Sequence, residues 1–320
     1  MDIITNTEHS LAVEVEYLVK TFGDFVAVDH ISFTVSRGEI FGFLGPNGAG
    51  KSTTIRILCG LLLPSGGRAR VEAFDVATEA ELVKKNIGYM SQTFSLYNDL
   101  TIEENIDFFS GIYGVPEGRR QERKENVLQM AGLRERRNTM TRLLPGGWKQ
   151  RLALGCAILH EPPILFLDEP TSGVDPITRR GFWELIYQLA EAGHTIFVTT
   201  HYMDEAEYCH RLALMYKGKI IAHGSPSSLR GIQQTHALIH LESSDLLGSM
   251  KALDGHEEIL DVAVFGSGLH VTVKDPDSAT PRIRQTLEQQ QIIVKQLEVI
   301  HPSMEDVFVA LIEEQEQKTA

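Results

Sequence analysis

A glycine-rich stretch early in the chain has the residue types and spacing of a phosphate-binding loop. Its members are Gly45, Pro46, Asn47, Gly48, Ala49, Gly50, Lys51, Ser52 and Thr53. Glycines let the backbone approach an anion closely, and consecutive N–H groups at a helix start attract negative charge. Lys51 is expected to reach the terminal phosphates of a nucleoside triphosphate, and the Ser52 hydroxyl to ligate Mg²⁺. A glycine-rich turn before an ordinary helix is the alternative.

Two acidic residues at the end of an apolar run could supply the hydrolytic chemistry. Asp168 and Glu169 directly follow the apolar residues 164–167, and His201 follows a second apolar run. A nucleoside triphosphatase needs a second Mg²⁺ anchor, a base that activates water and a sensor of the γ-phosphate. Asp168 suits the anchor, Glu169 the base and His201 the sensor. The alternatives are two solvated charges after a strand and a structural histidine.

The elements around these residues are expected to form an open α/β sheet. Residues 40–44 should be a buried strand before the loop, and residues 53–62 a helix after it. Residues 164–167 are apolar at every position, which is typical of a strand buried on both faces of a parallel sheet, and residues 195–199 should be another buried strand. Such sheets bind ligands at the carboxyl ends of their strands. The residues then expected on one rim are Ser52, Asp168, Glu169 and His201.

The other segments suggest a core with additions. Alternating strands are expected at 13–17 and 31–35, and a short strand at 71–76. Residues 93–160 should be mostly helical, with capping-box spacing at Thr101–Glu104. Phe22, 23 residues before Gly45, could stack on a base or belong to the core.

The pattern of expected strands and helices changes near Gly231. We therefore divide the chain into a flexible N-terminus at 1–12, a nucleotide-binding domain at 13–230 and a small α+β domain at 235–320. The last 90 residues carry fifteen acidic and six basic side chains of a chain with net charge −13. That acidic tail disfavours binding to nucleic acid or anionic lipid. No apolar run is long enough to span a bilayer, and the first ten residues lack a signal-peptide core.

The three cysteines, Cys59, Cys156 and Cys209, are far apart and form no C-x-x-C pair. Each lies in a segment expected to be helical. Free, mostly buried thiols in a reducing cytosol are the expectation, rather than a metal or redox site.

Taken together, these stretches resemble the ATP-binding subunits of ABC transporters over about residues 13–230. Residues 45–53 look like the Walker A loop and residues 164–169 like Walker B with its catalytic glutamate. Gln92 matches the Q-loop glutamine, residues 144–151 resemble the signature motif, residues 172–175 the D-loop, and His201 the switch histidine. Phe22 falls at the adenine-stacking position.

The resemblance implies a fold, ligands and residue roles. The fold would be a P-loop NTPase core with an antiparallel β portion and a helical lobe at about 93–160. Catalytic roles would fall to Glu169, His201 and Gln92. ATP would be bound by Phe22, residues 45–53, Pro145, Gly146, Gly147 and Asp175. Mg²⁺ would be bound by Ser52, Gln92 and Asp168.

The D-loop region and the tail at 302–308 are similar to ABC-2 exporters, especially drug-efflux subunits. That similarity implies a homo- or heterodimer of ATPase subunits with ATP between them, held on the cytoplasmic face of the membrane by a separate permease of ABC-2 type. The permease would dock near the Q-loop, where Phe94, Leu96 and Tyr97 could form its groove or be buried in the lobe. The 235–320 domain would be regulatory or stabilise the dimer. The alternative function is a soluble ABC ATPase acting on ribosomes or DNA.

One position departs from the family pattern. The signature usually has serine where this chain has Pro145, so a hydroxyl and a backbone N–H are lost. Proline suits a first helical turn and favours extended geometry at Leu144. The departure affects expected transition-state contacts from this loop and leaves nucleotide binding by residues 45–53 unaffected.

Overall fold

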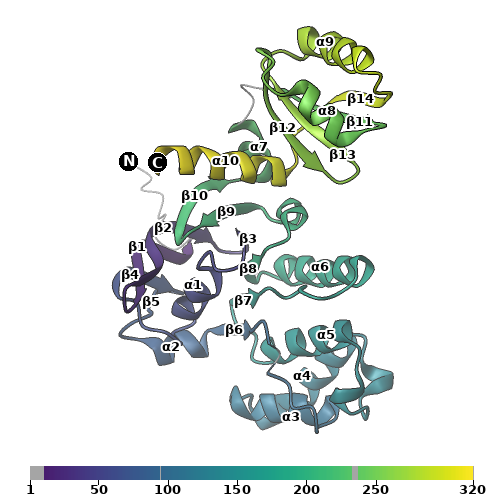
Figure 1. Cartoon of the computed structure of the whole chain (residues 1–320). Coiled ribbons are helices and arrows are strands. Elements are labelled where there is room, and N and C mark those ends of the chain that lie inside the picture. Colours follow the sequence, from purple (N-terminus) through teal and green to yellow (C-terminus); the bar gives the residue numbers. More distant parts are fainter. Residues whose placement is uncertain (1–10, 94, 233–236, 320) are drawn as a thin grey trace, which may run out of the picture. The chain divides into compact units, whose positions relative to one another are not determined.

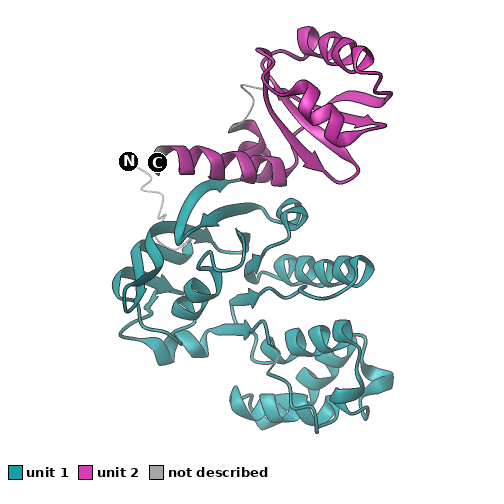
Figure 2. Ribbon diagram, in the orientation of Figure 1, with its two compact units in different colours: residues 1–225 teal, residues 226–320 magenta. Residues whose placement is uncertain are grey.

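The computed structural model describes residues 11–93, 95–232 and 237–319. The chain forms two compact units, Met1–Ser225 and Pro226–Ala320, which we call unit 1 and unit 2 (Figure 2). Most of the N-terminus predicted to be flexible lies outside the described residues. Leu11 and Ala12, which were included in that segment, already belong to the first strand.

Unit 1 is built around a six-stranded sheet of order β10-β9-β3-β8-β7-β6 (Figure 1). The strands are β3 (Ile40–Leu44), β6 (Ile87–Met90), β7 (Ile164–Asp168), β8 (Thr195–Thr200), β9 (Arg211–Tyr216) and β10 (Lys219–Gly224). All neighbours pair in parallel except β10, which is antiparallel to β9. The parallel sheet predicted from the apolar runs is therefore confirmed.

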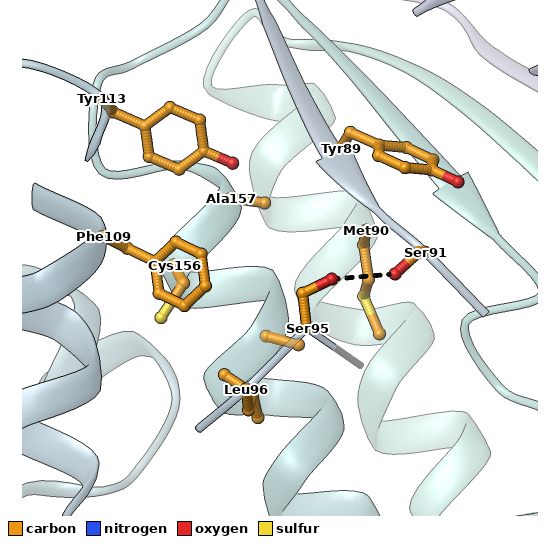
Figure 3. A pocket seen from close by; sticks show the side chains of 10 residues that line it. Tyr89, Met90, Ser91, Ser95, Leu96, Phe109, Tyr113, Cys156 and Ala157 are labelled. Carbon is orange, nitrogen blue, oxygen red and sulfur yellow. Dashed lines mark hydrogen bonds between the residues drawn. The ribbon is translucent and has the colours of Figure 1, made fainter. Parts of the chain in front are cut away.

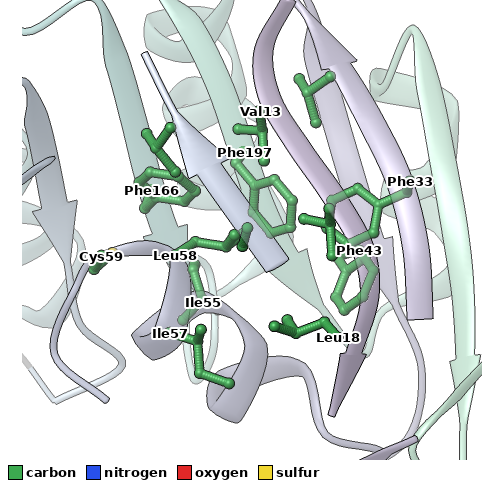
Figure 4. Close-up of a cluster of buried hydrophobic side chains, with 14 of the residues drawn as sticks. Val13, Leu18, Phe33, Phe43, Ile55, Ile57, Leu58, Cys59, Phe166 and Phe197 are labelled. Carbon is green, nitrogen blue, oxygen red and sulfur yellow. The ribbon is translucent and has the colours of Figure 1, made fainter. Parts of the chain in front are cut away.

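Side chains alternate between two cores on the faces of this sheet. In β7, Phe166 points to a cluster that contains Phe197 of β8, at 5.4 Å between ring centroids (Figure 4). Leu165 and Leu167 point to the other cluster. Helix α1 (Lys51–Leu58) contributes to the first and helix α6 (Pro176–Glu191) to the second. Burial on both faces explains why every position of β7 is apolar until Asp168.

An antiparallel sheet of order β2-β1-β4-β5 completes the β portion of unit 1. Its strands are β1 (Leu11–Phe22), β2 (Phe25–Ser36), β4 (Gly66–Val71) and β5 (Phe74–Asp75). The single strand predicted at 71–76 is wrong, because Glu72 and Ala73 adopt positive φ angles of 50° and 70° and turn the chain back between β4 and β5. The helix predicted at 53–62 begins at Lys51 and ends at Leu58.

The helical lobe contains α3 (Ile102–Ile112), α4 (Glu117–Met130) and α5 (Gly146–Ala157), which lie together in Figure 1. The predicted capping box is present, because the Thr101 side chain accepts from the Glu104 N–H and the Glu104 side chain accepts from the Thr101 N–H. A separate apolar cluster holds these helices together. The lobe also has the 3-10 helices Arg134–Arg136 and Thr141–Leu143, and other short helices of unit 1 are α2 (Ala80–Lys85) and the 3-10 helix Met203–Tyr208.

Unit 2 is a small α+β fold with its own apolar cluster. An antiparallel sheet of order β12-β13-β11-β14 is formed by β11 (Ala237–Ser243), β12 (Ile259–Phe265), β13 (Gly268–Val273) and β14 (Val294–Ile300). Its helices are α7 (Pro226–Ile232), α8 (Leu246–Leu253), α9 (Pro276–Gln289) and α10 (Met304–Thr319). In the part of the chain that the structure describes, no helix is long and apolar enough to cross a membrane.

The three cysteines are free and buried. Burial raises the pKa of each thiol above its ordinary value. Of the three, only Cys156 lies within an α-helix as predicted, because Cys59 directly follows α1 and Cys209 follows a 3-10 helix. Over residues 11–93, 95–232 and 237–319, no cluster of three or more His, Cys, Asp or Glu side chains could hold a metal ion.

Candidate nucleotide-binding and catalytic site

The predicted site residues follow the carboxyl ends of neighbouring parallel strands. The loop at 45–50 follows β3, Asp168 ends β7, and His201 follows β8. Gln92 lies two residues after β6. Because these strands are parallel, their carboxyl ends share one edge of the sheet, and the side chains meet there through the contacts described below.

Glycine is required at several positions of the loop. A Cβ at Gly45 would lie 2.2 Å from the Met215 carbonyl oxygen, and a Cβ at Gly50 would lie 2.4 Å from the Ala27 carbonyl oxygen. Gly48 has φ of 80° and no atom within 4 Å of its Cβ position. The loop is thus fixed on one side by close packing and open at Gly48, a cradle suited to phosphate oxygens.

Lys51 is almost fully buried beneath this loop. Its Nζ donates to the carbonyl oxygens of Gly45 (2.8 Å) and Pro46 (3.1 Å) and lies 3.3 Å from Glu169 Oε1. Burial lowers the pKa of the Lys51 ammonium, and the charge of Glu169 opposes that shift. The ammonium therefore already faces carboxylate oxygen at a buried position.

Glu169 is the residue on which the predicted catalytic side chains converge. Its Oε2 accepts from Gln92 Nε2 at 3.0 Å and contacts His201 Nδ1 at 3.1 Å. Its side chain is 6% exposed, so the alternative of a solvated charge is wrong. The backbone φ of 48° is unusual for a residue other than glycine, and it is held by the Glu169 N–H, which donates to Thr199 Oγ1 at 3.0 Å.

An oxygen-rich point beside Glu169 fits Mg²⁺. Ser52 Oγ donates to Asp168 Oδ1 at 3.0 Å, and Thr199 Oγ1 donates to the same oxygen at 2.7 Å. A hydroxyl and a carboxylate are hard oxygen ligands of the kind that this cation prefers. Gln92, also expected as a ligand, uses its Nε2 to contact Glu169 here. Thr199 was missed because a threonine in a buried strand carries no distinctive sequence signal.

Phe22 lies at the end of β1 and is 50% exposed, so the core interpretation is wrong. Lys20 Nζ lies 5.1 Å from its ring centroid. An exposed aromatic ring with a neighbouring cation is able to stack on a base. The assignment of that role to Phe22 stays a prediction.

In the signature-like loop, hydrogen bonds connect Pro145 to the start of α5. Leu144 is extended with ψ of 135°, as predicted, and the Pro145 carbonyl accepts from the N–H groups of Trp148 and Lys149 at the start of α5. A Cβ at Gly147 would lie only 2.2 Å from Thr178 Cγ2. Thr178 is in turn fixed by Asp175, because its Oγ1 donates to Asp175 Oδ2 at 2.6 Å.

Asp175 has a structural role that the sequence interpretation did not include. It caps α6 by accepting from the N–H groups of Ile177 and Thr178. The hydrogen bond from the Thr178 hydroxyl, followed by those from the Thr178 and Ile177 N–H groups, lowers the pKa of the Asp175 carboxyl. Its predicted contact with nucleotide stays a prediction.

Comparison with known proteins shows similarity along most of the chain. A family model described as ABC transporter matches residues 28–172, and one described as ATP-binding protein DrrA1-3-like, C-terminal domain, matches residues 224–312. The probable multidrug ABC transporter ATP-binding protein YbhF of Escherichia coli is 52% identical over 227 residues, or 71% of this chain. The chain spans only 39% of the length of YbhF.

Two further matches extend this similarity. The daunorubicin/doxorubicin resistance ATP-binding protein DrrA of Streptomyces peucetius is 33% identical over 315 residues, which cover 96% of this chain and 94% of DrrA. Among solved structures, the dimeric post-hydrolysis state of the ATP-binding cassette MJ0796 bound to ADP and Pi matches with a TM-score of 0.61 and 27% identity, over 67% of this chain and 98% of that one.

Proposed function

Because the chain belongs to the family of ABC transporter ATP-binding proteins, we propose that it binds and hydrolyses ATP to power an exporter. The observation that carries the proposal is the environment of Glu169, a buried carboxylate contacted by Lys51, Gln92 and His201. A general base positioned beside a phosphate-binding loop can polarise the water that attacks the γ-phosphorus. ADP and inorganic phosphate are the products.

The geometry suggests how nucleotide prepares the base. Lys51 pairs with Glu169 in this structure, and phosphate oxygens would compete for the same ammonium. Lys51 would then stabilise charge on the phosphates and release Glu169 Oε1 to accept a hydrogen bond from water. Gln92 and His201 would hold the carboxylate through Oε2. Mg²⁺ held by Ser52 and Asp168, with Gln92, would neutralise charge on the phosphate oxygens.

The assembly in which this chemistry occurs is part of the proposal. Two ATPase subunits, either two copies of this chain or this chain with a second subunit, would enclose ATP so that residues 145–147 of one cover the nucleotide of the other. A permease of ABC-2 type would hold the pair at the cytoplasmic face of the membrane. The relatives named as export and resistance ATP-binding proteins support a role in export. No observation favours the alternative of action on ribosomes or DNA.

Glu169→Gln tests the proposed chemistry. The variant should bind ATP but hydrolyse it more slowly by about 10²–10⁴-fold, the usual contribution of a general base. ATP turnover and the affinity for a fluorescent ATP analogue are the measurements. Glu184→Gln, the same change on the exposed face of α6, is the matched control and should hydrolyse normally. Normal turnover by Glu169→Gln would show that another residue is the base.

A small pocket in unit 1 supports docking of a permease near Gln92. It has a volume of about 30 Å³ and lies between the end of β6 and the helical lobe, with Met90, Leu96 and Phe109 in its wall (Figure 3). This is far below the roughly 300 Å³ of a drug site and leaves room for about one methyl group, such as the tip of an apolar side chain on a docking helix. Leu96 packs against the lobe cluster, whereas Tyr97 is 48% exposed. Phe94 lies outside the described residues.

Tyr97→Asp tests this docking. The Tyr97 ring packs against Phe108 at 4.5 Å and extends the apolar surface beside the pocket. A carboxylate there should release the chain from the membranes of the cells that produce it and leave ATP binding unchanged. The fraction that sediments with membranes is the measurement. Tyr17→Asp, which alters a 71% exposed tyrosine of β1, is the control. Unchanged sedimentation of Tyr97→Asp would contradict docking at this surface.

A further inference from the structure

A buried glutamate links the segment that follows Glu169 to the segment that follows His201. Glu205 lies in the 3-10 helix Met203–Tyr208, and its side chain is 0% exposed. Its Oε1 accepts from Thr171 Oγ1 at 2.6 Å, and Thr171 is also fully buried, two residues after Glu169. One short hydrogen bond therefore joins the loop behind the catalytic glutamate to the helix behind the histidine.

Arg179 of α6 makes a second link between the same segments. Its Nε lies 3.7 Å from Glu205 Oε1, and its Nη1 donates to Asp204 Oδ2 at 3.3 Å. Its guanidinium carbon lies 3.8 Å from the centroid of the Tyr202 ring, and that centroid lies 4.2 Å from the centroid of the His201 ring. Contacts therefore run continuously from Glu205 through Arg179 and Tyr202 to His201.

Stability alone does not account for this carboxylate. A buried charge is costly unless it is paired well, and an apolar residue of similar volume is often as stable. The pairing of Glu205 with Arg179 is loose, because among the described residues neither Glu205 Oε2 nor Arg179 Nε has a hydrogen-bond partner. The feature that Glu205 does define well is the distance between the two segments that it joins.

We propose that Glu205 is a positioning residue for ATP hydrolysis. By holding Thr171 and Arg179, it keeps Glu169 Oε2 at 3.1 Å from His201 Nδ1. The inference rests on the proposed ATPase function. Among the described residues, Glu205 is bonded to Thr171, Arg179 and Cys209 and makes no hydrogen bond or ion pair with residues 45–53, so its loss should lower kcat without changing ATP affinity.

Thr171→Val and Thr171→Ser form the test pair. Valine keeps the shape and removes the hydroxyl that Glu205 accepts from, whereas serine keeps the hydroxyl. We expect Thr171→Val to lower kcat on the order of tenfold, less than the roughly 10²-fold that a 1 Å misplacement costs. ATP affinity should stay constant, and Thr171→Ser should retain most of the rate. Equal kcat for the two variants would overturn the proposal.

A second background separates positioning from a general structural effect. In a His201→Ala chain the contact between Glu169 and residue 201 is already absent. Adding Thr171→Val should therefore not lower the residual kcat further. A full additional loss would overturn the proposal.

Should Thr171→Val fail to fold, Glu205→Gln is the deciding variant. It keeps an acceptor oxygen for Thr171 but loses the charge that faces Arg179. Lower kcat at constant affinity supports the inference, and unchanged kcat refutes it. A wild-type chain without hydrolysis would refute the proposed function instead.

Discussion

Gly147 lacks a side chain because Thr178 occupies the space that a Cβ would need. Thr178 cannot rotate away freely, since its N–H and hydroxyl both donate to Asp175. Overpacking usually costs about 1–3 kcal/mol, and alanine in place of glycine gains about 1 kcal/mol in a helix. We therefore expect Gly147→Ala to lower the free energy of unfolding by about 0–2 kcal/mol net. Urea unfolding is the measurement.

The matched rescue is Thr178→Ser. Serine removes the clashing Cγ2 and keeps the Oγ that donates to Asp175. In the Thr178→Ser background, Gly147→Ala should be neutral or stabilising. If the alanine remains destabilising there, the contact with Thr178 is not the reason for the glycine.

Single residues also show what the sequence could reveal about the site. Asp168, Glu169 and Ser52 were identified because their neighbours form recognisable patterns, and the structure brings all three together. Thr171 and Glu205 were not identified. Their hydrogen bond joins residues 34 positions apart, and neither residue type is unusual in its own segment.

At the scale of the elements, His160 connects the helical lobe to the sheet. It follows α5, its Nε2–H donates to the carbonyl oxygen of Ile87 at the start of β6 (3.0 Å), and its ring stacks on Tyr113 at 4.2 Å. Burial lowers the pKa of the imidazole, and the Ile87 carbonyl opposes this only in part. The folded chain therefore favours neutral His160.

This makes stability depend on pH in a predictable direction. Below its ordinary pKa, near 6.5, His160 of the unfolded chain binds a proton that the folded chain resists, so the free energy of unfolding falls as pH falls through that value. His160→Gln keeps a donor for Ile87 and does not titrate. Near neutral pH, the free energy of unfolding of this variant should differ from that of the wild type by a constant. Towards pH 5 the free energy of unfolding of the wild type should fall further, so the variant becomes more stable relative to it. If the urea-unfolding midpoints of the wild type and of His160→Gln change equally with pH across that range, His160 is not the source of the pH dependence.

The elements were predictable to different degrees for physical reasons. Strands β3 and β7 were placed within one residue, because burial on both faces demands continuous apolar runs. The turn at Glu72 and Ala73 was missed. Positive φ at such residues is set by the pairing of β4 with β5 and not by their own preferences.

At the scale of the whole molecule, each unit has its own apolar core. A chain that ends at Ser225 should therefore fold and bind a fluorescent ATP analogue with unchanged affinity. If unit 2 stabilises the dimer, which is one of the two roles expected for residues 235–320, the truncated chain should dimerise more weakly with ATP in the Glu169→Gln background. Sedimentation velocity is the measurement. A folded truncation without nucleotide binding would contradict this division of roles.

The exporter-like motif at residues 302–308 has a structural role in unit 2. Ser303 and Asp306 form reciprocal hydrogen bonds at the start of α10, and Asp306 Oδ1 lies 2.7 Å from His270 Nδ1 of β13. The motif therefore begins a helix and attaches it to the sheet of the same unit. Its sequence similarity alone did not reveal this role.

The burial of all three thiols has a practical consequence for chemical labelling. Thiolates, not thiols, react with maleimides, and both burial and a raised pKa keep Cys59, Cys156 and Cys209 in the unreactive form at neutral pH. The native chain can therefore serve as a nearly silent background without removal of its cysteines. A single cysteine introduced at an exposed position, such as Ile177, would carry the whole signal of a probe or crosslink placed there.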